Sequence, residues 1–227
     1  MRALIIETST ERGLIALTEN EQVITSTELP IGLNQSKHLM PELQKLFVTH
    51  SIIAGSIDCI GVGVGPGSYT GIRIGVSVAK AFAYAWGIPL IDFSSLCAFV
   101  PQEREMAFAT LIDAKMGGAY ILKASINADG TMHSILPPQV CALEQLNEQL
   151  SDIYLIVSPT IKILKSKVDE MYPNSQWQWQ ETPPSSSTLA KIVHAKYQSK
   201  EWNREGHLKL LYLRKTQAEL EKEKENF

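Results

Sequence analysis

Residues 64–75, which read VGPGSYTGIRIG, form the densest glycine segment of the chain and are the first place to look for chemistry. The segment follows an apolar run and precedes a helical one, and free N–H groups at a helix N-terminus attract anions. Neither the GxxxxGK[ST] pattern of a P-loop nor the GxGxxG pattern of a dinucleotide site occurs here. Pro66 fixes φ, and Gly65 and Gly67 tolerate unusual backbone angles, so a simple turn also explains the segment.

No other grouping of reactive side chains has the spacing of a catalytic or metal site. The five histidines of the chain are never one helical turn apart, as two metal ligands on a helix would be. Cys59, Cys97 and Cys141 are far apart and form no CxxC pair, which argues against a disulfide framework and against a zinc site. Ser68 follows a glycine but lacks the GxSxG pattern of a hydrolase nucleophile.

The helix expected over residues 70–86 is apolar on almost every side. Gly71 and Gly75 lie four residues apart on one face, and each costs about 1 kcal/mol relative to alanine in a helix interior. Close packing against another backbone offsets this cost, and that backbone belongs either to the same chain or to another one. Of these two, we favour docking by a different polypeptide. The positive charge of Arg73 is unfavourable near the N-terminus of this expected helix, because the helix dipole is positive there. We therefore expect Arg73 to point at a carboxylate or at a partner.

The order of elements around this helix is repeated in the second half of the chain. The strands expected in the first half are residues 2–7, 13–18, 22–28, 58–64 and 88–93, and the helices are 34–50, 70–86 and one more short helix capped by Ser94 or Ser95. The second half has strands at 107–113, 118–126, 131–140, 153–157 and 177–180, and helices at 143–150, 160–171 and 187–198. An extended segment at 208–214 and a charged tail at 219–226 follow.

This order, βββαβαβα written twice, predicts an α/β protein with two lobes side by side, the actin-like architecture (ASKHA, RNase H-like). We expect lobe one over residues 1–104. A smaller or degenerate lobe two is expected over 105–227. The last helix either stays with lobe two or returns to lobe one, and the sequence leaves both arrangements open.

The composition excludes two classes of protein. The net charge of −3 provides no global basic field of the kind that dominates binding to nucleic acid, so any contact with nucleic acid needs a partner. No window contains the ~18 apolar residues of a membrane span, and the first residues are too short an apolar run for a signal peptide. We therefore expect a cytoplasmic protein without membrane contact.

Residues 63–90, GVGPGSYTGIRIGVSVAKAFAYAWGIPL, resemble the signature stretch of the TsaB (YeaZ) family, which takes part in making threonylcarbamoyladenosine in tRNA. Shorter matches follow the same order along the chain. They are Glu7-Thr8-Ser9-Thr10 after strand one, residues 36–41 before the first helix, Pro89, Ile112-Asp113-Ala114, and Tyr212-Leu213-Arg214.

The resemblance implies an actin-like fold and a non-catalytic role. It implies pairing with a larger catalytic paralogue, TsaD, and a small ATPase, TsaE, while tRNA is reached only through the complex. A rival interpretation stays open, in which the chain self-associates as a homodimer through the same face and has no dedicated partner. The pairing surface implied by the family lies on the first two helices of lobe one, and the residues expected there are Ser36, Leu39, Met40, Leu43, Tyr69, Thr70, Arg73, Ile74, Ser77, Val78 and Ala81.

The chain departs from the family pattern where a nucleotide would bind. Glu7 stands where Asp is usual, Gln35 where His is usual, and residues 157–160 replace a glycine-rich segment. We therefore expect at most a vestigial nucleotide or anion site, formed by Glu7, Thr8, Ser9, Gly67, Ser68 and Asp113. No metal and no resident cofactor are expected, and ATP or ADP would bind only weakly, at the partner interface. The alternative is a small ATPase or kinase of the same fold that works without a partner.

Overall fold

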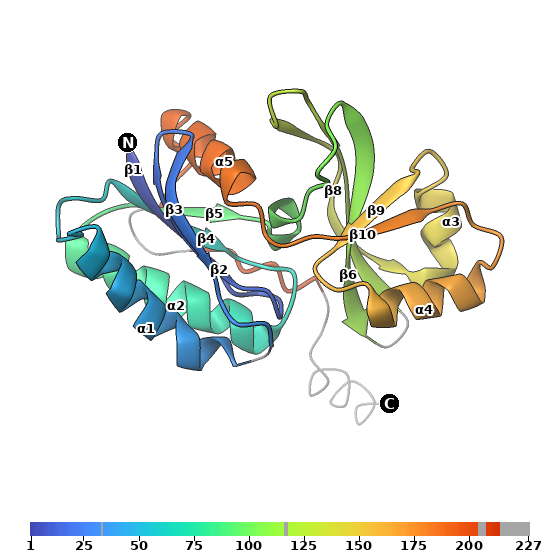
Figure 1. Cartoon of the computed structure of the whole chain (residues 1–227), viewed down its shortest axis with the longest axis horizontal. Coiled ribbons are helices and arrows are strands. Elements are labelled where there is room, and N and C mark those ends of the chain that lie inside the picture. The colour runs from blue at the N-terminus through green and yellow to red at the C-terminus, as the bar shows by residue number, and fades with distance from the viewer. Residues whose placement is uncertain (33, 116–117, 204–207, 214–227) are drawn as a thin grey trace, which may run out of the picture.

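Two five-stranded sheets, one from each half of the chain, form the framework of the protein (Figure 1). The computed structural model describes residues 1–32, 34–115, 118–203 and 208–213, and the statements below concern these residues. The strands of the first sheet are β1 (Arg2–Glu7), β2 (Leu14–Glu19), β3 (Gln22–Glu28), β4 (Cys59–Gly63) and β5 (Leu90–Phe93). Those of the second are β6 (Met106–Lys115), β7 (Gly118–Ile126), β8 (Met132–Ala142), β9 (Leu155–Ser158) and β10 (Gln178–Glu181).

The two sheets have the same connectivity. The first has the order β3-β2-β1-β4-β5 and the second β10-β9-β6-β7-β8, which is the same order read from the other edge. In each sheet the first strand pairs antiparallel with the second and parallel with the fourth. The predicted duplicated, actin-like α/β fold is confirmed. Below, lobe one means the first sheet with the helices packed on it, and lobe two means the second sheet with its helices.

Lobe one is a three-layer structure with β1 at its centre. The helices α1 (Gln35–Thr49) and α2 (Tyr69–Trp86) lie side by side on one face of the sheet, and α5 (Ser186–Gln198) covers the other (Figure 1). Side chains of β1 alternate between the two layers: Leu4 and Ile6 join the core under α1 and α2, whereas Ala3 and Ile5 join the core under α5. Because both faces are covered, the strand is apolar throughout rather than alternating with polar residues.

The last helix packs on lobe one, one of the two arrangements that the sequence left open. Val193 of α5 lies against β4, where a Cβ added at Gly61 would be 2.5 Å from Val193 Cγ2. The Lys196 ammonium donates to the backbone oxygen of Asp92 (2.9 Å) and pairs with its carboxylate (3.0 Å). Lobe one is therefore built from two separate parts of the chain.

Lobe two carries shorter helices than its sequence suggests. The single helix predicted over residues 143–150 is a 3-10 turn, η2 (Leu143–Gln145), followed by the four-residue α3 (Leu146–Gln149). The next helix, α4 (Lys162–Met171), begins two residues later than predicted and has no side-chain cap, and the Ser158 hydroxyl donates to the Thr160 carbonyl before it. By contrast, α1 and α2 match their predicted bounds to within one residue at each end.

The chain after α5 runs back across lobe one. Asn203 pairs with Leu90 of β5, and residues 208–213 lie over the start of α2 without regular structure. The predicted extended segment is described only up to Leu213, and Arg214, His207 and the charged tail at 219–226 lie outside the described residues. Within the described residues, none of the helices has both the length and the apolar character needed to cross a membrane.

Candidate partner-binding face and interlobe cleft

The glycine segment before α2 works as a turn and a helix cap. The Ser68 hydroxyl accepts a hydrogen bond from Gly71 N (3.3 Å), the usual N-cap arrangement. Gly65 has φ +96°, which favours glycine. Ser68 N donates to Ser9 O (2.7 Å), which ties the turn to the loop after β1, and a Cβ at Gly67 would lie 2.3 Å from the same oxygen.

The two glycines of α2 face the interior of lobe one, so the expectation that a different polypeptide docks on them is wrong, whereas the small residues Ser77, Ala81 and Ala85 are exposed. A Cβ at Gly71 would lie 2.1 Å from Thr8 O, and one at Gly75 would lie 2.3 Å from Thr8 Oγ1. The Thr8 hydroxyl donates to Gly71 O (2.8 Å), so the loop after β1 and the helix are joined directly. The group that packs against these glycines is therefore Thr8 of the same chain, directly after β1.

The opposite side of α2 and the outer side of α1 remain exposed. The exposed residues of α2 recur every three or four positions: Thr70, Arg73, Ser77, Lys80, Ala81, Tyr84 and Ala85. Large apolar side chains lie among them, with Tyr84 92% and Val48 of α1 76% exposed. Phe47 of α1 packs against Phe82 and Trp86 of α2, with ring centroids 5.2 and 5.6 Å apart, so the two outer surfaces are continuous. We call this surface the α1–α2 face.

The residues predicted to bind a partner separate into three groups by exposure. Six are exposed, namely Ser36, Met40, Thr70, Arg73, Ser77 and Ala81. Tyr69, Ile74 and Val78 are half-buried. Leu39 and Leu43 are completely buried in the core with Leu4 and Ile6, because their four-residue spacing places both on the side of α1 that packs on the sheet. These two are core residues, so naming them as contact residues is wrong.

Glu7 ends β1 inside the protein, with no exposed surface. Ser9 donates to its Oε1 from both the backbone N (2.6 Å) and the hydroxyl (2.5 Å). Its Oε2 has no hydrogen-bond partner in the described part of the chain. Oε2 fills the place where a side chain at Gly63 would be, since a Cβ there would lie 1.8 Å away. Burial raises the pKa of Glu7, and the hydrogen bonds from Ser9 offset this only in part.

The predicted vestigial site is split between the lobes. Hydrogen bonds connect Glu7 to Ser9 and Ser9 to Ser68, and Thr8 and Gly67 belong to the same cluster. Asp113, near the end of the first strand of lobe two, pairs instead with Lys115 (3.2 Å) and Lys167 (3.3 Å). Partial burial acts to raise the pKa of Asp113, but bonds from the Lys115 backbone and both ammonium groups outweigh it and lower the pKa. No group of three His, Cys, Asp or Glu residues within the described ranges is arranged to hold a metal ion.

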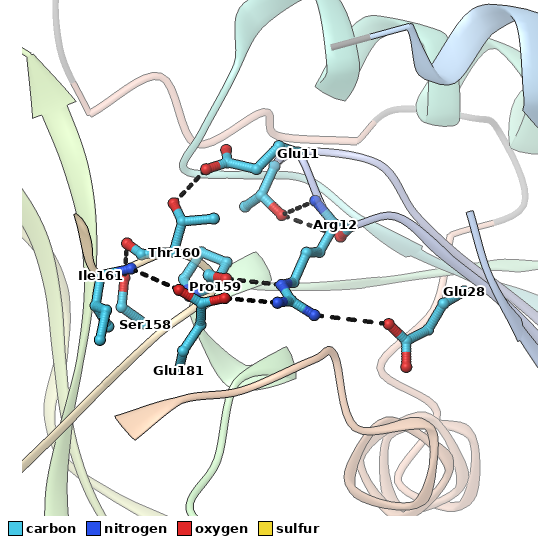
Figure 2. A network of polar contacts seen from close by, with 9 residues as sticks. Glu11, Arg12, Glu28, Ser158, Pro159, Thr160, Ile161 and Glu181 are labelled. Carbon is cyan, nitrogen blue, oxygen red and sulfur yellow. Dashed lines mark hydrogen bonds and ion pairs between the residues drawn. The ribbon is translucent and has the colours of Figure 1, made fainter. Parts of the chain in front are cut away.

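Arg12 of lobe one contacts lobe two directly, as Figure 2 shows. Its Nε donates to Pro159 O (2.8 Å), and one terminal nitrogen pairs with Glu181 (2.7 Å). The other terminal nitrogen lies 3.9 Å from Glu28 of lobe one. Glu181 also accepts from Ile161 N (3.1 Å) at the start of α4, where a negative charge is favoured by the helix dipole.

A second link lies beside the first. The Thr160 hydroxyl donates to the Glu11 carboxylate, again joining lobe two to the loop after β1 (Figure 2). Gln35 stabilises this loop, since its amide donates to Glu11 O (3.2 Å) and Gly32 O (3.1 Å). Glu11 and Arg12 of lobe one therefore contact lobe two at Pro159, Thr160 and Glu181. No sequence pattern pointed to Glu11 and Arg12, since their partners are 149 and 147 to 169 residues away.

Comparisons with known proteins identify related sequences and structures. A family model described as TsaD: tRNA N6-adenosine threonylcarbamoyltransferase matches residues 32–174. The "tRNA threonylcarbamoyladenosine biosynthesis protein TsaB" of Bacillus subtilis (strain 168) is 30% identical over 154 residues, 67% of either chain. The chain belongs to the TsaB (YeaZ) family. The protein of the same name from Escherichia coli (strain K12) is 29% identical over 69% of this chain and 71% of that one.

The TsaB family assignment extends to the fold of the whole molecule. A Pseudomonas aeruginosa crystal structure, described as an uncharacterized protein with similarity to peptidase YeaZ, has a TM-score of 0.76 with this chain. It is 22% identical, and the match covers 94% of this chain and 99% of that one. Both lobes are therefore part of the likeness, and at this identity the likeness concerns the fold alone.

Proposed function

We propose that this chain is a non-catalytic subunit of the machinery that makes N6-threonylcarbamoyladenosine in tRNA, and that it pairs with a TsaD-like catalytic paralogue. The observation that carries the proposal is the α1–α2 face. It is an exposed, continuous two-helix surface with Met40, Val48 and Tyr84 49%, 76% and 92% exposed. Soluble proteins rarely keep such apolar surface on adjacent helices uncovered unless another chain covers it.

The non-catalytic part of the proposal is supported by the polar contacts of the predicted nucleotide site and of the junction between the lobes. Glu7 is buried and bonded to its own loop, and Asp113 is paired with two lysines. The guanidinium of Arg12 is already bonded to Pro159 and Glu181 of lobe two, so a phosphate would have to displace these bonds to reach it. No histidine pair in the whole sequence has the spacing of a helical metal site. We propose accordingly that the chain has no resident cofactor and that any ATP or ADP binds weakly, at the partner interface.

The proposed mechanism is differential binding. By covering helices of the partner, the α1–α2 face would favour the partner's competent conformation, and it can shift that equilibrium only by the difference in its affinity for the two states. A TsaE-like ATPase joins the pair. Because the net charge is −3, we propose that the chain contacts tRNA only through the complex. The proposed location of this complex is the cytoplasm.

The test is complex formation with the TsaD-like paralogue of the same organism, followed by size-exclusion chromatography. Ser77→Trp places a bulky ring on the exposed side of α2 and is expected to abolish the complex without changing the melting temperature. Ser166→Trp, at an exposed position of α4 in lobe two, is the matched control and should bind as the wild type does. An unchanged complex with Ser77→Trp contradicts the proposal.

Two measurements on the isolated chain examine the alternatives. Calorimetry measures the binding of Mg-ATP, and an assay of phosphate release measures its turnover. Tight binding together with turnover would favour an ATPase or kinase that works without a partner. Light scattering tells whether the chain is a homodimer alone. A homodimer that the paralogue fails to dissociate would mean that the α1–α2 face serves self-association.

A further inference from the structure

The segment 208–213 delivers a side chain to the first turn of α2 from the far end of the sequence. Leu211 N donates to Val64 O (2.9 Å), just before the glycine turn. Leu208, Leu210 and Leu211 pack on the core under α2. The segment is thus anchored by apolar burial and one backbone hydrogen bond, and it places Tyr212 over residues 69–73.

Tyr212 forms a layered contact with two residues of α2. Its ring stacks on Tyr69, with centroids 4.7 Å apart and planes inclined by 22°. Arg73 Nε donates to the Tyr212 hydroxyl (3.2 Å), and Arg73 Cζ lies 5.8 Å from the centroid of the same ring. A guanidinium held by both a hydrogen bond and a ring face has lost much of its rotational freedom before any ligand arrives.

The charge of Arg73 has no counterpart in the described part of the chain. Arg73 is exposed, and no ion pair to an Asp or Glu of the described residues involves it. The groups that act on its pKa most strongly, and raise it, are the hydroxyl and charge of Tyr212. Arg73 is the fifth residue of α2, beyond the first turn where the helix dipole acts most strongly. The fold therefore orders an exposed cation without supplying an anion from the described residues.

We propose that Arg73, held on the ring of Tyr212, is the charged anchor of the α1–α2 face and binds a carboxylate of the partner chain. The proposal rests on the proposed pairing and adds the chemistry of one contact to it. Arginine and tyrosine are the side chains that most often dominate binding at interfaces, and pre-ordering removes part of the entropy cost. The neighbouring apolar groups of the face would keep water away from the ion pair.

A carboxylate fits better than a tRNA phosphate, because nucleic-acid binding needs several cations over one surface and this chain is acidic overall. The chain's own tail contains Glu219 and a run in which Glu221, Glu223 and Glu225 alternate with two lysines. The experiment must therefore distinguish a partner carboxylate from a carboxylate of this tail and from RNA.

Calorimetric titration of the full-length chain with the TsaD-like paralogue tests the anchor. Arg73→Ala is expected to weaken binding about tenfold or more, and Arg73→Lys to weaken it less, since lysine keeps the charge and loses the planar contact. Tyr212→Ala should weaken binding several-fold by freeing Arg73, and Tyr212→Phe should have a smaller effect. Arg104→Ala, an exposed arginine outside α1 and α2, is the matched control and should bind normally. Raising the salt concentration should reduce wild-type affinity more steeply than that of Arg73→Ala.

Each outcome has a defined meaning. If the wild-type chain fails to bind the paralogue, the proposed pairing itself is wrong. If the wild type binds and Arg73→Ala binds equally well, pairing stands and the anchor is wrong. Loss of the Arg73→Ala effect in a chain lacking residues 214–227 would assign Arg73 to the tail. Binding of tRNA by the chain alone that is lost in Arg73→Ala would assign it to phosphate. Melting curves show whether each variant is folded. If Tyr212→Ala is unstable, the affinity of Arg73→Lys for the paralogue tests the anchor in its place.

Discussion

Lobe one and lobe two have the same strand order, but they carry different helices. The two helices on the outer side of the first sheet have 15 and 18 residues, whereas the corresponding elements of lobe two are a four-residue helix and a ten-residue helix. The longer pair presents the α1–α2 face, with its exposed Val48 and Tyr84. Shared topology thus does not imply shared surface, and the candidate function belongs to the side chains of one lobe.

The carboxylates near the end of the first strand of each lobe differ in the same way. Glu7 is enclosed and accepts hydrogen bonds from Ser9 of its own loop, whereas Asp113 is paired with Lys115 and Lys167 near the surface. Burial dominates at Glu7, and cationic and backbone donors dominate at Asp113. Equivalent positions of a duplicated fold have therefore acquired opposite electrostatics.

The largest expected effect is in lobe one, at the contact between α2 and Thr8, the residue that follows β1. Gly75→Trp should destabilise the protein by about 3 kcal/mol or more, or prevent folding, because even a Cβ there meets Thr8 Oγ1. Urea denaturation followed by circular dichroism measures this. Ser77→Trp, on the outer side of the same helix, is the control and should fold normally. A stable Gly75→Trp chain that has lost only its pairing would restore the idea that the glycines bind a partner.

The second test concerns Glu7. Its pKa is raised above the ordinary value of 4.5, so the folded chain holds the proton more tightly than the unfolded chain does. The contribution of Glu7 to the free energy of unfolding is therefore fully present below about pH 4.5 and is lost as the pH rises through the folded pKa. The amount lost is about 1.4 kcal/mol for each pH unit that separates the folded and unfolded pKa values. Glu7→Gln should be more stable than the wild type at pH 7, with the difference vanishing near pH 4. Equal stability at both pH values would mean that Glu7 is not protonated inside the fold.

Asp113 should respond in the opposite direction. Its pKa is lowered below the ordinary value of 3.8, so its contribution is complete above that pH and is lost as the pH falls through the folded pKa. Asp113→Asn should be less stable than the wild type at pH 7, by less than about 1 kcal/mol because solvent screens the lysine pairs. Thermal melts at pH 7 and pH 3 provide the comparison. A stabilising Asp113→Asn substitution would contradict the assigned electrostatics.

The smallest expected effect is at the junction of the two lobes. A double-mutant cycle of Arg12→Ala and Glu181→Ala should give a coupling of about 0.5–1 kcal/mol, since the Arg12 side chain is 16% and that of Glu181 37% exposed. The pair Lys45 and Glu42, 3.9 Å apart on α1, is the control within lobe one and should couple less. A coupling at the junction no larger than in the control would mean that Arg12 does not hold the lobes together.

Local patterns predicted the elements best where periodicity and caps were clear. The bounds of α1 and α2 follow from apolar spacing, from Ser68 as N-cap and from Gly87 at φ +66° after the last turn. In lobe two, the amphipathic run at residues 143–150 predicted one helix, whereas the structure has a 3-10 turn followed by a four-residue helix. The candidate site was predicted in part: the exposed Ser77 and Ala81 fit the pairing surface, while Leu39 and Leu43 are core.

The sequence by itself determined the duplicated strand order, the two long helices, the capped turn before α2 and the family, because each of these depends on neighbours a few residues apart or on a local signature. Only the tertiary structure decided which side of α2 is exposed, that α5 covers lobe one, that Arg12 crosses to lobe two, and that Tyr212 holds Arg73. The physical reason is distance along the chain. Arg73 and Tyr212 are 139 residues apart, and no local pattern specifies which distant surfaces folding brings together.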